Sequence, residues 1–179
     1  MLGGPQPGIV VGRADLIAKL KKNLFKRALR CDKLTLAALG AVLQLYGDPD
    51  RLAAQVPTLR LLARPAEEIE ALALRLVPVV AAWAGTRASI DVQAVQSQIG
   101  SGALPADRLP SHALRFTPPG SKRTSGRALD ELAAALRALP VPVIGHIADG
   151  ALLLDLRCLE DEAGFRALFA TPAERPTPA

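Results

Sequence analysis

The sequence predicts an α+β fold, in which a helical first half precedes a small domain with an antiparallel sheet covered by helices on one face. Three observations predict it. Apolar residues recur at helical spacing over 13–84, apolar and polar residues alternate with period two over 88–94, and an Asp149-Gly150 turn joins two apolar runs within 143–156. With 179 residues and 50% hydrophobic content, the chain is long and apolar enough to bury a core.

The first elements follow from their apolar spacing, caps and breakers. The short apolar run 8–11 predicts a buried strand, and 13–22 follows with helical spacing. Asp32 is a suitable N-cap for a helix that runs to about residue 46, where Gly47-Asp48-Pro49 stops it. A short helix that begins at Asp48 or Asp50 should end before Pro57.

The longest predicted helix covers residues 65–84. Pro65 suits a first helical turn, and Glu67 and Glu68 lie near the positive end of the helix dipole. Pro78 lies inside this helix and should kink it, because its ring removes a backbone donor and clashes with the preceding turn.

The second half alternates strands and helices. Loops rich in glycine and proline are expected at 97–105 and 118–126. The predicted elements are, in chain order, strands at 88–94 and 113–116, a helix at 127–138, a hairpin at 143–156 and a closing helix at 160–169.

Composition narrows the function classes. The net charge of +5 suits a nucleic-acid partner, although the 3% aromatic content offers little base stacking. The two cysteines, Cys31 and Cys158, have no metal-like spacing and indicate packing residues in a reduced, cytoplasmic protein. The apolar stretch 72–85 is too short to span a bilayer and contains Arg75, and no export signal is visible, so no membrane is expected.

Two motifs are candidates for binding an anion. In Gly3-Gly4-Pro5-Gln6 the glycines would let backbone amides approach a phosphate, although such turns are also common for conformational reasons alone. Arg27 and Arg30 lie three residues apart, so on a helical turn both guanidinium groups could hold one tetrahedral oxyanion. A charge run of this kind is also typical of a solvated face.

The opening Leu2–Gly12, read with Lys26–Leu39, resembles the segment that follows the cofactor lysine in bacterial selenocysteine synthase, the L-seryl-tRNA(Sec) selenium transferase family. The resemblance extends over nearly the whole chain except its proline-rich tail. It departs from the family in the 97–105 loop, where Ser101 and Ala103 replace a glycine and a serine.

The resemblance implies a C-terminal fragment of a fold-type I pyridoxal phosphate transferase. The Schiff-base lysine would lie just before Met1, so no catalytic residue is assigned and the isolated chain is expected to be inactive. The intact family enzyme, a homo-oligomer, converts seryl-tRNA(Sec) to selenocysteinyl-tRNA(Sec) with selenophosphate. By this resemblance Arg27 and Arg30 hold the selenium donor, and Gly3 and Gly4 lie near the cofactor phosphate.

The same resemblance divides the chain into four parts. Residues 1–30 would be a remnant of the large cofactor-binding domain, 31–86 connecting helices, 87–170 the small α+β domain and 171–179 a disordered tail.

Two other interpretations remain open. One is a paralogous pyridoxal phosphate lyase or transferase that acts on a small amino acid. The other is a non-catalytic module that serves oligomerisation or contacts tRNA. His112 and His146 have no partner at a catalytic spacing and are expected at the surface or in packing, and the acids Asp155 and 160–162 do not suggest a metal site.

Overall fold

The computed structural model describes residues 3–97, 109–120 and 122–170. The predicted tail at 171–179 and nearly all of the predicted 97–105 loop lie outside these residues. The chain divides into two compact units, Met1–Ala63 and Arg64–Ala179. This division falls within the stretch predicted as connecting helices.

The first unit is helical and confirms three of the predicted helices. The elements are α1 (Ala14–Lys22), the 3-10 helix η1 (Leu24–Arg27), α2 (Lys33–Leu45), α3 (Pro49–Gln55) and α4 (Pro57–Ala63). The sequence pattern does not predict α4, because Pro57 ends α3 but is also well suited to the first position of a new helix.

Asp32 caps α2 as predicted. Its Oδ1 accepts a hydrogen bond from the Thr35 backbone N–H at 2.8 Å, and its Oδ2 accepts one from the Thr35 hydroxyl at 2.8 Å. These donors from Thr35 lower the pKa of the Asp32 carboxyl below its usual range, because they favour the ionised form. The cap therefore fixes where α2 begins.

The prediction of a strand at residues 8–11 is wrong. These residues have no regular secondary structure, and Val10 and Val11 are 70% and 87% exposed. A strand is stable only when a neighbouring strand satisfies its backbone groups, and all the strands of the described residues lie between 89 and 155. The apolar run was recognised correctly, but the described residues contain no strand that pairs with it.

The first unit buries little apolar surface of its own. Val56, 3% exposed, is the only fully buried hydrophobic residue among those described there. Burial of apolar surface is the main source of folding stability, so contacts within this unit contribute little stability. Its exposed large apolar residues are Ile9, Val10, Val11, Leu16, Leu20, Leu24, Phe25, Leu29, Leu34, Leu36 and Leu43.

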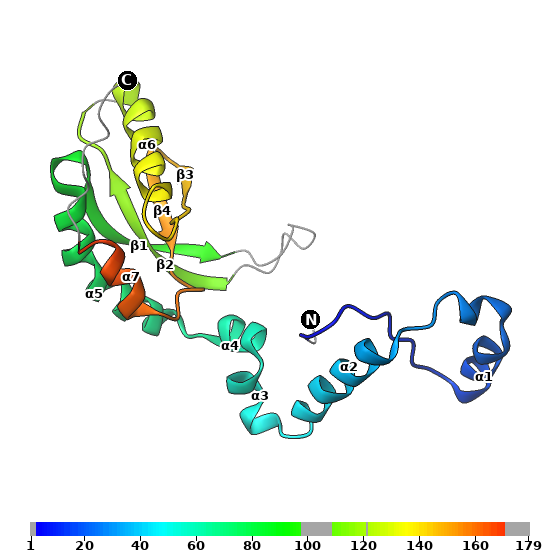
Figure 1. Ribbon diagram of the computed structural model, residues 1–179. Helices are drawn as coiled ribbons and strands as arrows, with labels where there is room; N and C mark the ends of the chain where they lie inside the picture. The colour runs from blue at the N-terminus through cyan, green and yellow to red at the C-terminus, as the bar shows by residue number, and fades with distance from the viewer. Residues whose placement is uncertain (1–2, 98–108, 121, 171–179) are drawn as a thin grey trace. The chain divides into compact units, whose positions relative to one another are not determined.

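The second unit contains a four-stranded antiparallel sheet in the order β1-β2-β4-β3 (Figure 1). Val92 on β1 pairs with Leu114 on β2, which pairs in turn with Leu154 on β4. The strands are β1 (Ser89–Ser97), β2 (Leu109–Thr117), β3 (His146–Ala148) and β4 (Ala151–Asp155). This sheet confirms the α+β fold class.

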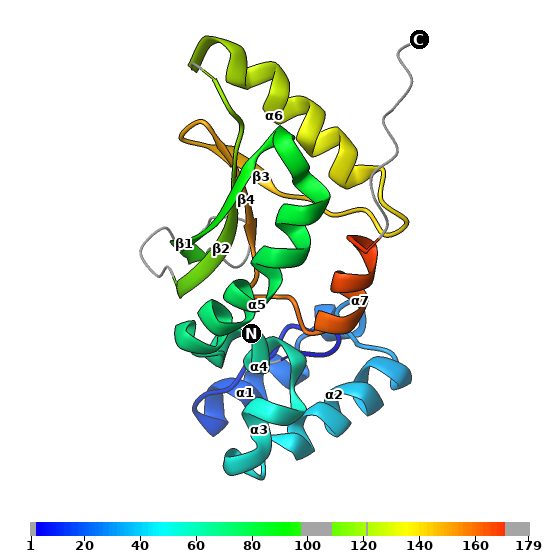
Figure 2. The ribbon, with the colours of Figure 1, turned by 90° about the vertical axis from the view of Figure 1, so that its left-hand side faces the viewer.

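Helices cover one face of this sheet (Figure 2). Alternate residues of β2 and β4 point to that face, among them Leu114, Phe116 and Leu154. They pack against the buried stripe of α5 and against Leu129, Leu132 and Leu136 of α6. The helices of this unit are α5 (Ala66–Ala84), the 3-10 helix η2 (Gly85–Arg87), α6 (Lys122–Arg137) and α7 (Glu162–Leu168).

The predicted hairpin is confirmed. Asp149 has φ +49° and Gly150 has φ +72°, so both residues between β3 and β4 adopt the left-handed conformation that a type I′ turn requires. The prediction of β2 as 113–116 was too short, since Pro110, Ser111 and His112 break the apolar pattern although they pair with β1. α6 likewise begins before the predicted residue 127.

Ala66–Arg87 is, in the described part of the chain, the one helical stretch long and apolar enough to cross a bilayer. Seven residues of α5, including Ile69, Leu76 and Val80, are buried. Packing against the sheet accounts for the apolar character of this helix.

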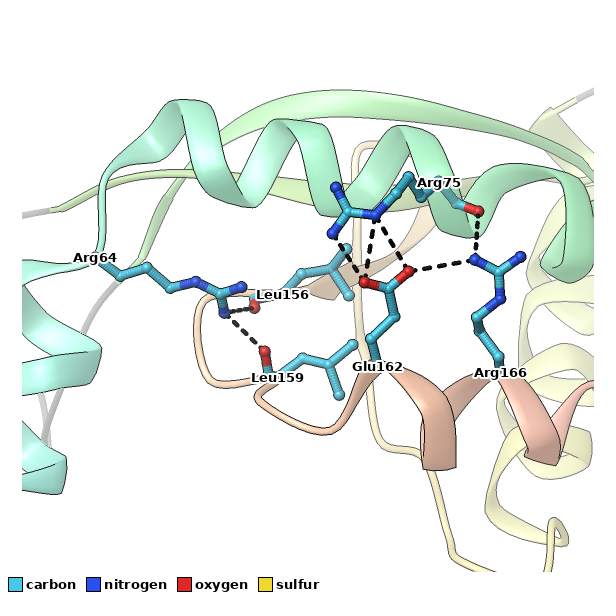
Figure 3. A network of polar contacts seen from close by, with 6 residues as sticks. All are labelled: Arg64, Arg75, Leu156, Leu159, Glu162 and Arg166. Atoms are coloured by element: carbon cyan, nitrogen blue, oxygen red, sulfur yellow. Dashed lines mark hydrogen bonds and ion pairs between the residues drawn. The ribbon is translucent and has the colours of Figure 1, made fainter.

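Two polar networks link α5, and Arg64 just before it, to the segment around α7 (Figure 3). The Arg64 guanidinium donates to the carbonyl oxygens of Leu156 and Leu159 at 3.3 and 2.7 Å. Glu162 accepts from Arg75 at 2.8 Å and from Arg166 at 3.2 Å. The side chain of Glu162 therefore bridges α5 and α7.

Lowering the pH is expected to remove the contribution of this bridge to stability. The hydrogen bond from Arg75 lowers the pKa of Glu162 below its ordinary value of 4.5. A depressed folded-state pKa means that the contribution is fully present above the unfolded-state pKa and is lost as the pH falls through the folded-state pKa. The difference in urea midpoint between the wild type and Glu162→Gln should be constant above about pH 4.5 and shrink below it.

A matched control is Glu131→Gln, which removes an exposed carboxylate paired with Arg127 within α6. Its urea midpoint should lie close to that of the wild type at every pH, because exposed pairs within one helix contribute little. The difference in urea midpoint between the wild type and Glu162→Gln should not stay constant down to about pH 3. If it did, the stabilising role assigned to the ionised Glu162 would be contradicted.

Candidate anion-binding site

The glycine turn at the start of the chain is held tightly within the first unit. Gly3 and Gly4 have φ +76° and +77°, a conformation that residues with a side chain rarely adopt. A Cβ added to Gly4 would lie 2.7 Å from Cγ2 of Val42, and one added to Gly3 would lie 3.2 Å from Cγ1 of Val56. Both glycines are therefore required for this backbone and for its packing on α2 and on Val56.

A pocket of about 460 Å³ lies beside this turn. Among the described residues, its lining contains no charged side chain and no amine. The lining residues are Gly3, Gly4, Pro5, Gln6, Pro7, Ile9, Leu39 and Thr58.

The arginine pair lies around the end of η1. The side chain of Asn23 caps η1 by accepting from the Phe25 N–H at 2.9 Å, and the regular helix ends at Arg27. The backbone continues as a turn in which the Leu29 N–H donates to the Phe25 carbonyl at 3.2 Å, and Arg30 follows this turn. The two arginines therefore flank a turn instead of sharing the face of one regular helix, as the spacing had suggested.

Both guanidinium groups are available to a ligand. Arg27 and Arg30 are exposed, and within the described part of the chain neither makes a hydrogen bond or an ion pair. Neither residue lines the pocket beside Gly3 and Gly4. The glycine turn and the arginine pair, the two predicted parts of the site, therefore do not line the same pocket of the first unit.

The described residues do not form a complete site for pyridoxal phosphate. Among them, the pocket beside Gly3 and Gly4 offers no side-chain cation for the cofactor phosphate and no lysine for its aldehyde. The need for glycine at position 4 is explained by its positive φ and by the approach to Val42, with no ligand required. No chemical step through this cofactor is therefore derived from the described residues.

Of the other candidate groups, His112 contacts the backbone, whereas His146 and Cys158 lie at the surface. Nδ1 of the half-buried His112 lies 3.1 Å from the Ala66 carbonyl oxygen, while His146 is exposed on β3. Cys158 is exposed, so its prediction as a packing residue is wrong; it follows the strand in a loop that leaves its side chain at the surface. No group of three or more histidines, cysteines or acids within the described ranges could hold a metal ion.

One partly buried polar cluster was not predicted: Ser97, Ser111 and Arg157 are buried around Asp155, which is itself exposed. Asp155 accepts hydrogen bonds from the hydroxyls of Ser97 and Ser111, the latter at 2.7 Å, and from the Arg157 N–H at 3.0 Å. The guanidinium of Arg157, a residue only 3% exposed, donates to the carbonyl oxygens of Arg64 and Pro110. The cluster ties the ends of β1 and β2 to β4, and it joins residues far apart in the sequence, which no local pattern predicts.

Comparison with known proteins identifies the family. The family model for L-seryl-tRNA selenium transferase matches residues 1–160. The L-seryl-tRNA(Sec) selenium transferase of Klebsiella pneumoniae (strain 342) is 60% identical over 169 residues, which are 94% of this chain and 36% of that protein. The protein of the same name from Yersinia pestis (strain Pestoides F) is 56% identical over 163 residues, 91% of this chain and 35% of that protein.

The chain thus spans about a third of the length of these relatives. The family model nevertheless matches far more than half of the chain, through both compact units. The family model also covers the glycine turn and the arginine pair, since its match begins at residue 1. The chain therefore belongs to the L-seryl-tRNA selenium transferase family.

Proposed function

We propose that this chain supplies the C-terminal part of a pyridoxal phosphate-dependent transferase that converts seryl-tRNA(Sec) to selenocysteinyl-tRNA(Sec). The observation that carries the proposal is the 60% identity to a selenium transferase over 94% of the chain. A paralogous enzyme for a small amino acid would need no tRNA, and the names of the relatives favour the tRNA substrate.

Within this function, Arg27 and Arg30 bind the tetrahedral oxyanion of selenophosphate. Both side chains are exposed and free of intramolecular partners among the described residues, so an incoming anion displaces no existing ion pair. Guanidinium groups bind phosphate-like oxygens through paired, charge-assisted hydrogen bonds. The glycine turn has a supporting part, which is to hold the backbone of residues 3–7 against α2.

The first unit contacts further protein in the proposed enzyme. Its exposed apolar residues, such as Val11, Phe25 and Leu34, have no cover within their own unit, and a surface of this kind is typical of a protein–protein contact. The rest of the family fold and a second subunit of a homo-oligomer are the proposed contacts. Two free cysteines, Cys31 and Cys158, support the proposal of a reduced, cytoplasmic setting.

A chimera tests this function directly. Residues 1–169 of this chain replace the corresponding residues of the Klebsiella pneumoniae relative, which provides everything upstream. The chimera is expected to convert seryl-tRNA(Sec) to selenocysteinyl-tRNA(Sec) at a rate within about tenfold of the parent. A chimera that folded and assembled like the parent but transferred no selenium would contradict the proposal, and transfer to a free amino acid would favour the paralogous enzyme.

The 179-residue chain tested alone is expected to form no covalent adduct with pyridoxal phosphate. None of the lysines whose side chains the structure describes lines the pocket beside the glycine turn, and a stable adduct needs an amine held next to the bound aldehyde. After incubation, borohydride reduction and dialysis, mass spectrometry should find no modified lysine, while the chimera should carry one. Stoichiometric labelling of Lys19, Lys21, Lys22 or Lys26 would contradict this expectation.

A further inference from the structure

The positive charge of this chain is concentrated in one short stretch. Residues 13–33 contain eight lysines and arginines and two aspartates, a formal charge of +6, whereas the whole chain carries +5. The remaining residues together are therefore close to neutral, at −1. A compositional excess of arginine would spread the charge along the chain, so this concentration indicates a localised surface.

Neither aspartate neutralises the lysines of this stretch. Asp15 lies four residues before Lys19, a spacing that suits an ion pair, but its carboxylate instead accepts two hydrogen bonds from Arg13, at 3.1 and 2.8 Å. The carboxylate of Asp32 is occupied by the N–H and hydroxyl of Thr35. Both carboxylates are thus already engaged in local contacts.

Four lysines of this stretch form what we call the lysine cluster: Lys19, Lys21, Lys22 and Lys26. All four are exposed, and within the described residues none of them takes part in a hydrogen bond or an ion pair. Lys19 and Lys22 are one turn apart near the C-terminal end of α1, and Lys26 lies in the following η1. Like charges this close repel each other slightly, whereas the lysines in the last turn of α1 also lie near the negative end of its dipole.

We propose that the lysine cluster binds the sugar-phosphate backbone of the tRNA substrate, next to but distinct from the oxyanion site at Arg27 and Arg30. This proposal rests on the proposed function, which supplies an RNA as substrate. Backbone phosphates recur along an RNA strand and are bound by Lys and Arg, with release of counterions. A series of ammonium groups that continues along the chain from α1 into η1 matches such a repeating anion better than it matches one small ligand.

An anionic membrane surface is the competing partner. A basic amphipathic helix can lie on a membrane, and α1 does carry Leu16, Ile17 and Leu20 beside its lysines. However, α1 has only nine residues, and half of the eight basic residues lie beyond it, in η1, just after the turn that follows and at the first position of α2. The charge therefore follows the chain and not the polar face of one helix, which favours RNA.

Salt-dependent binding of the full chain to a transcribed, labelled tRNA(Sec) tests the proposal. Each bound phosphate contributes about 0.7–0.9 to the slope of log affinity against log salt concentration. Replacing all four lysines of the cluster by glutamine should lower this slope by roughly three between about 50 and 200 mM KCl. Replacing them by arginine should preserve the slope, which excludes misfolding at these positions as the cause of a loss.

The matched control is the double variant Arg127→Gln and Arg137→Gln, which removes exposed positive charge from α6 in the other unit. Its slope should equal that of the wild type. The proposal is overturned if the glutamine variant of the lysine cluster keeps the wild-type slope, or if the control loses as much slope per charge removed.

A third arm measures binding to vesicles of phosphatidylcholine and phosphatidylserine. The wild-type chain is expected to bind the tRNA at salt concentrations at which it does not bind these vesicles. Tighter binding to vesicles than to tRNA, lost on replacement of the lysine cluster, would overturn the assignment to RNA. The proposed function fails separately, in the chimera, because the RNA assay requires no selenium transfer.

Discussion

In the chimera, Arg27→Ala and Arg30→Ala are each expected to lower the rate of selenium transfer by tenfold or more, without loss of folding stability. Both side chains are exposed and have no partner within the described residues, so truncating them removes no contact that stabilises the fold. Surface changes of this kind usually alter the free energy of unfolding by no more than about 0.5 kcal/mol. Loss of a charge-assisted bond to the anionic donor, by contrast, costs about 1.5–3 kcal/mol.

The kinetic pattern separates anion binding from a general effect of charge. Arg27→Lys keeps the charge but loses the paired donors of guanidinium, so it should bind selenophosphate more weakly than the wild type and more tightly than Arg27→Ala. The matched control is Arg51→Ala, an arginine of α3 whose side chain is 75% exposed. Full transfer activity in both alanine variants, or equal losses in Arg51→Ala, would show that the pair is an ordinary solvated face.

The sequence predicted those elements whose signals are local. The cap of α2 at Asp32 depends on one side chain and a backbone N–H three residues later. The β3–β4 hairpin depends on an Asp149-Gly150 turn that few other residues could form. Both signals involve neighbours in the chain, so the sequence alone is sufficient to find them.

The sequence failed where the outcome depends on a partner. An apolar run such as 8–11 becomes a strand only beside another strand, and the described residues offer none. The opposite holds at the start of β2. Pro110 and Ser111 lack an apolar pattern, yet they belong to the strand because they pair with Gln96 and Val95 of β1. The local pattern therefore predicted a strand at 8–11 that does not form, and it predicted β2 too short.

The candidate site shows the same division. The glycine requirement at positions 3 and 4 was visible in the sequence, but the reason for it, the approach to Val42 and Val56, needed the fold. The spacing of Arg27 and Arg30 suggested one helical face, whereas the end of η1 at Arg27 places them on either side of a turn. Their role as an oxyanion site follows from their family resemblance and exposure and stays a prediction.

The largest expected effect on stability is that of Leu76→Ala in the second unit. Leu76 is completely buried in the stripe of α5 that packs against the sheet. Replacing a buried leucine by alanine removes apolar burial and leaves a cavity that the surroundings fill only partly, at a cost of about 2–5 kcal/mol. Alanine is itself a good helix former, so the change leaves the helical propensity of α5 intact.

Leu74→Ala makes the same chemical change two residues away, at a position 59% exposed, and is expected to alter the free energy of unfolding by no more than about 0.5 kcal/mol. Trp83, the only tryptophan of the chain, is 5% exposed in the same core, with its ring centroid 5.3 Å from that of Phe169. Its fluorescence during urea unfolding therefore reports on this unit without interference from the first. Equal urea midpoints for Leu76→Ala and Leu74→Ala would contradict the placement of the core between α5 and the sheet. Only truncation of the buried Leu76 side chain leaves a space that its neighbours cannot fill.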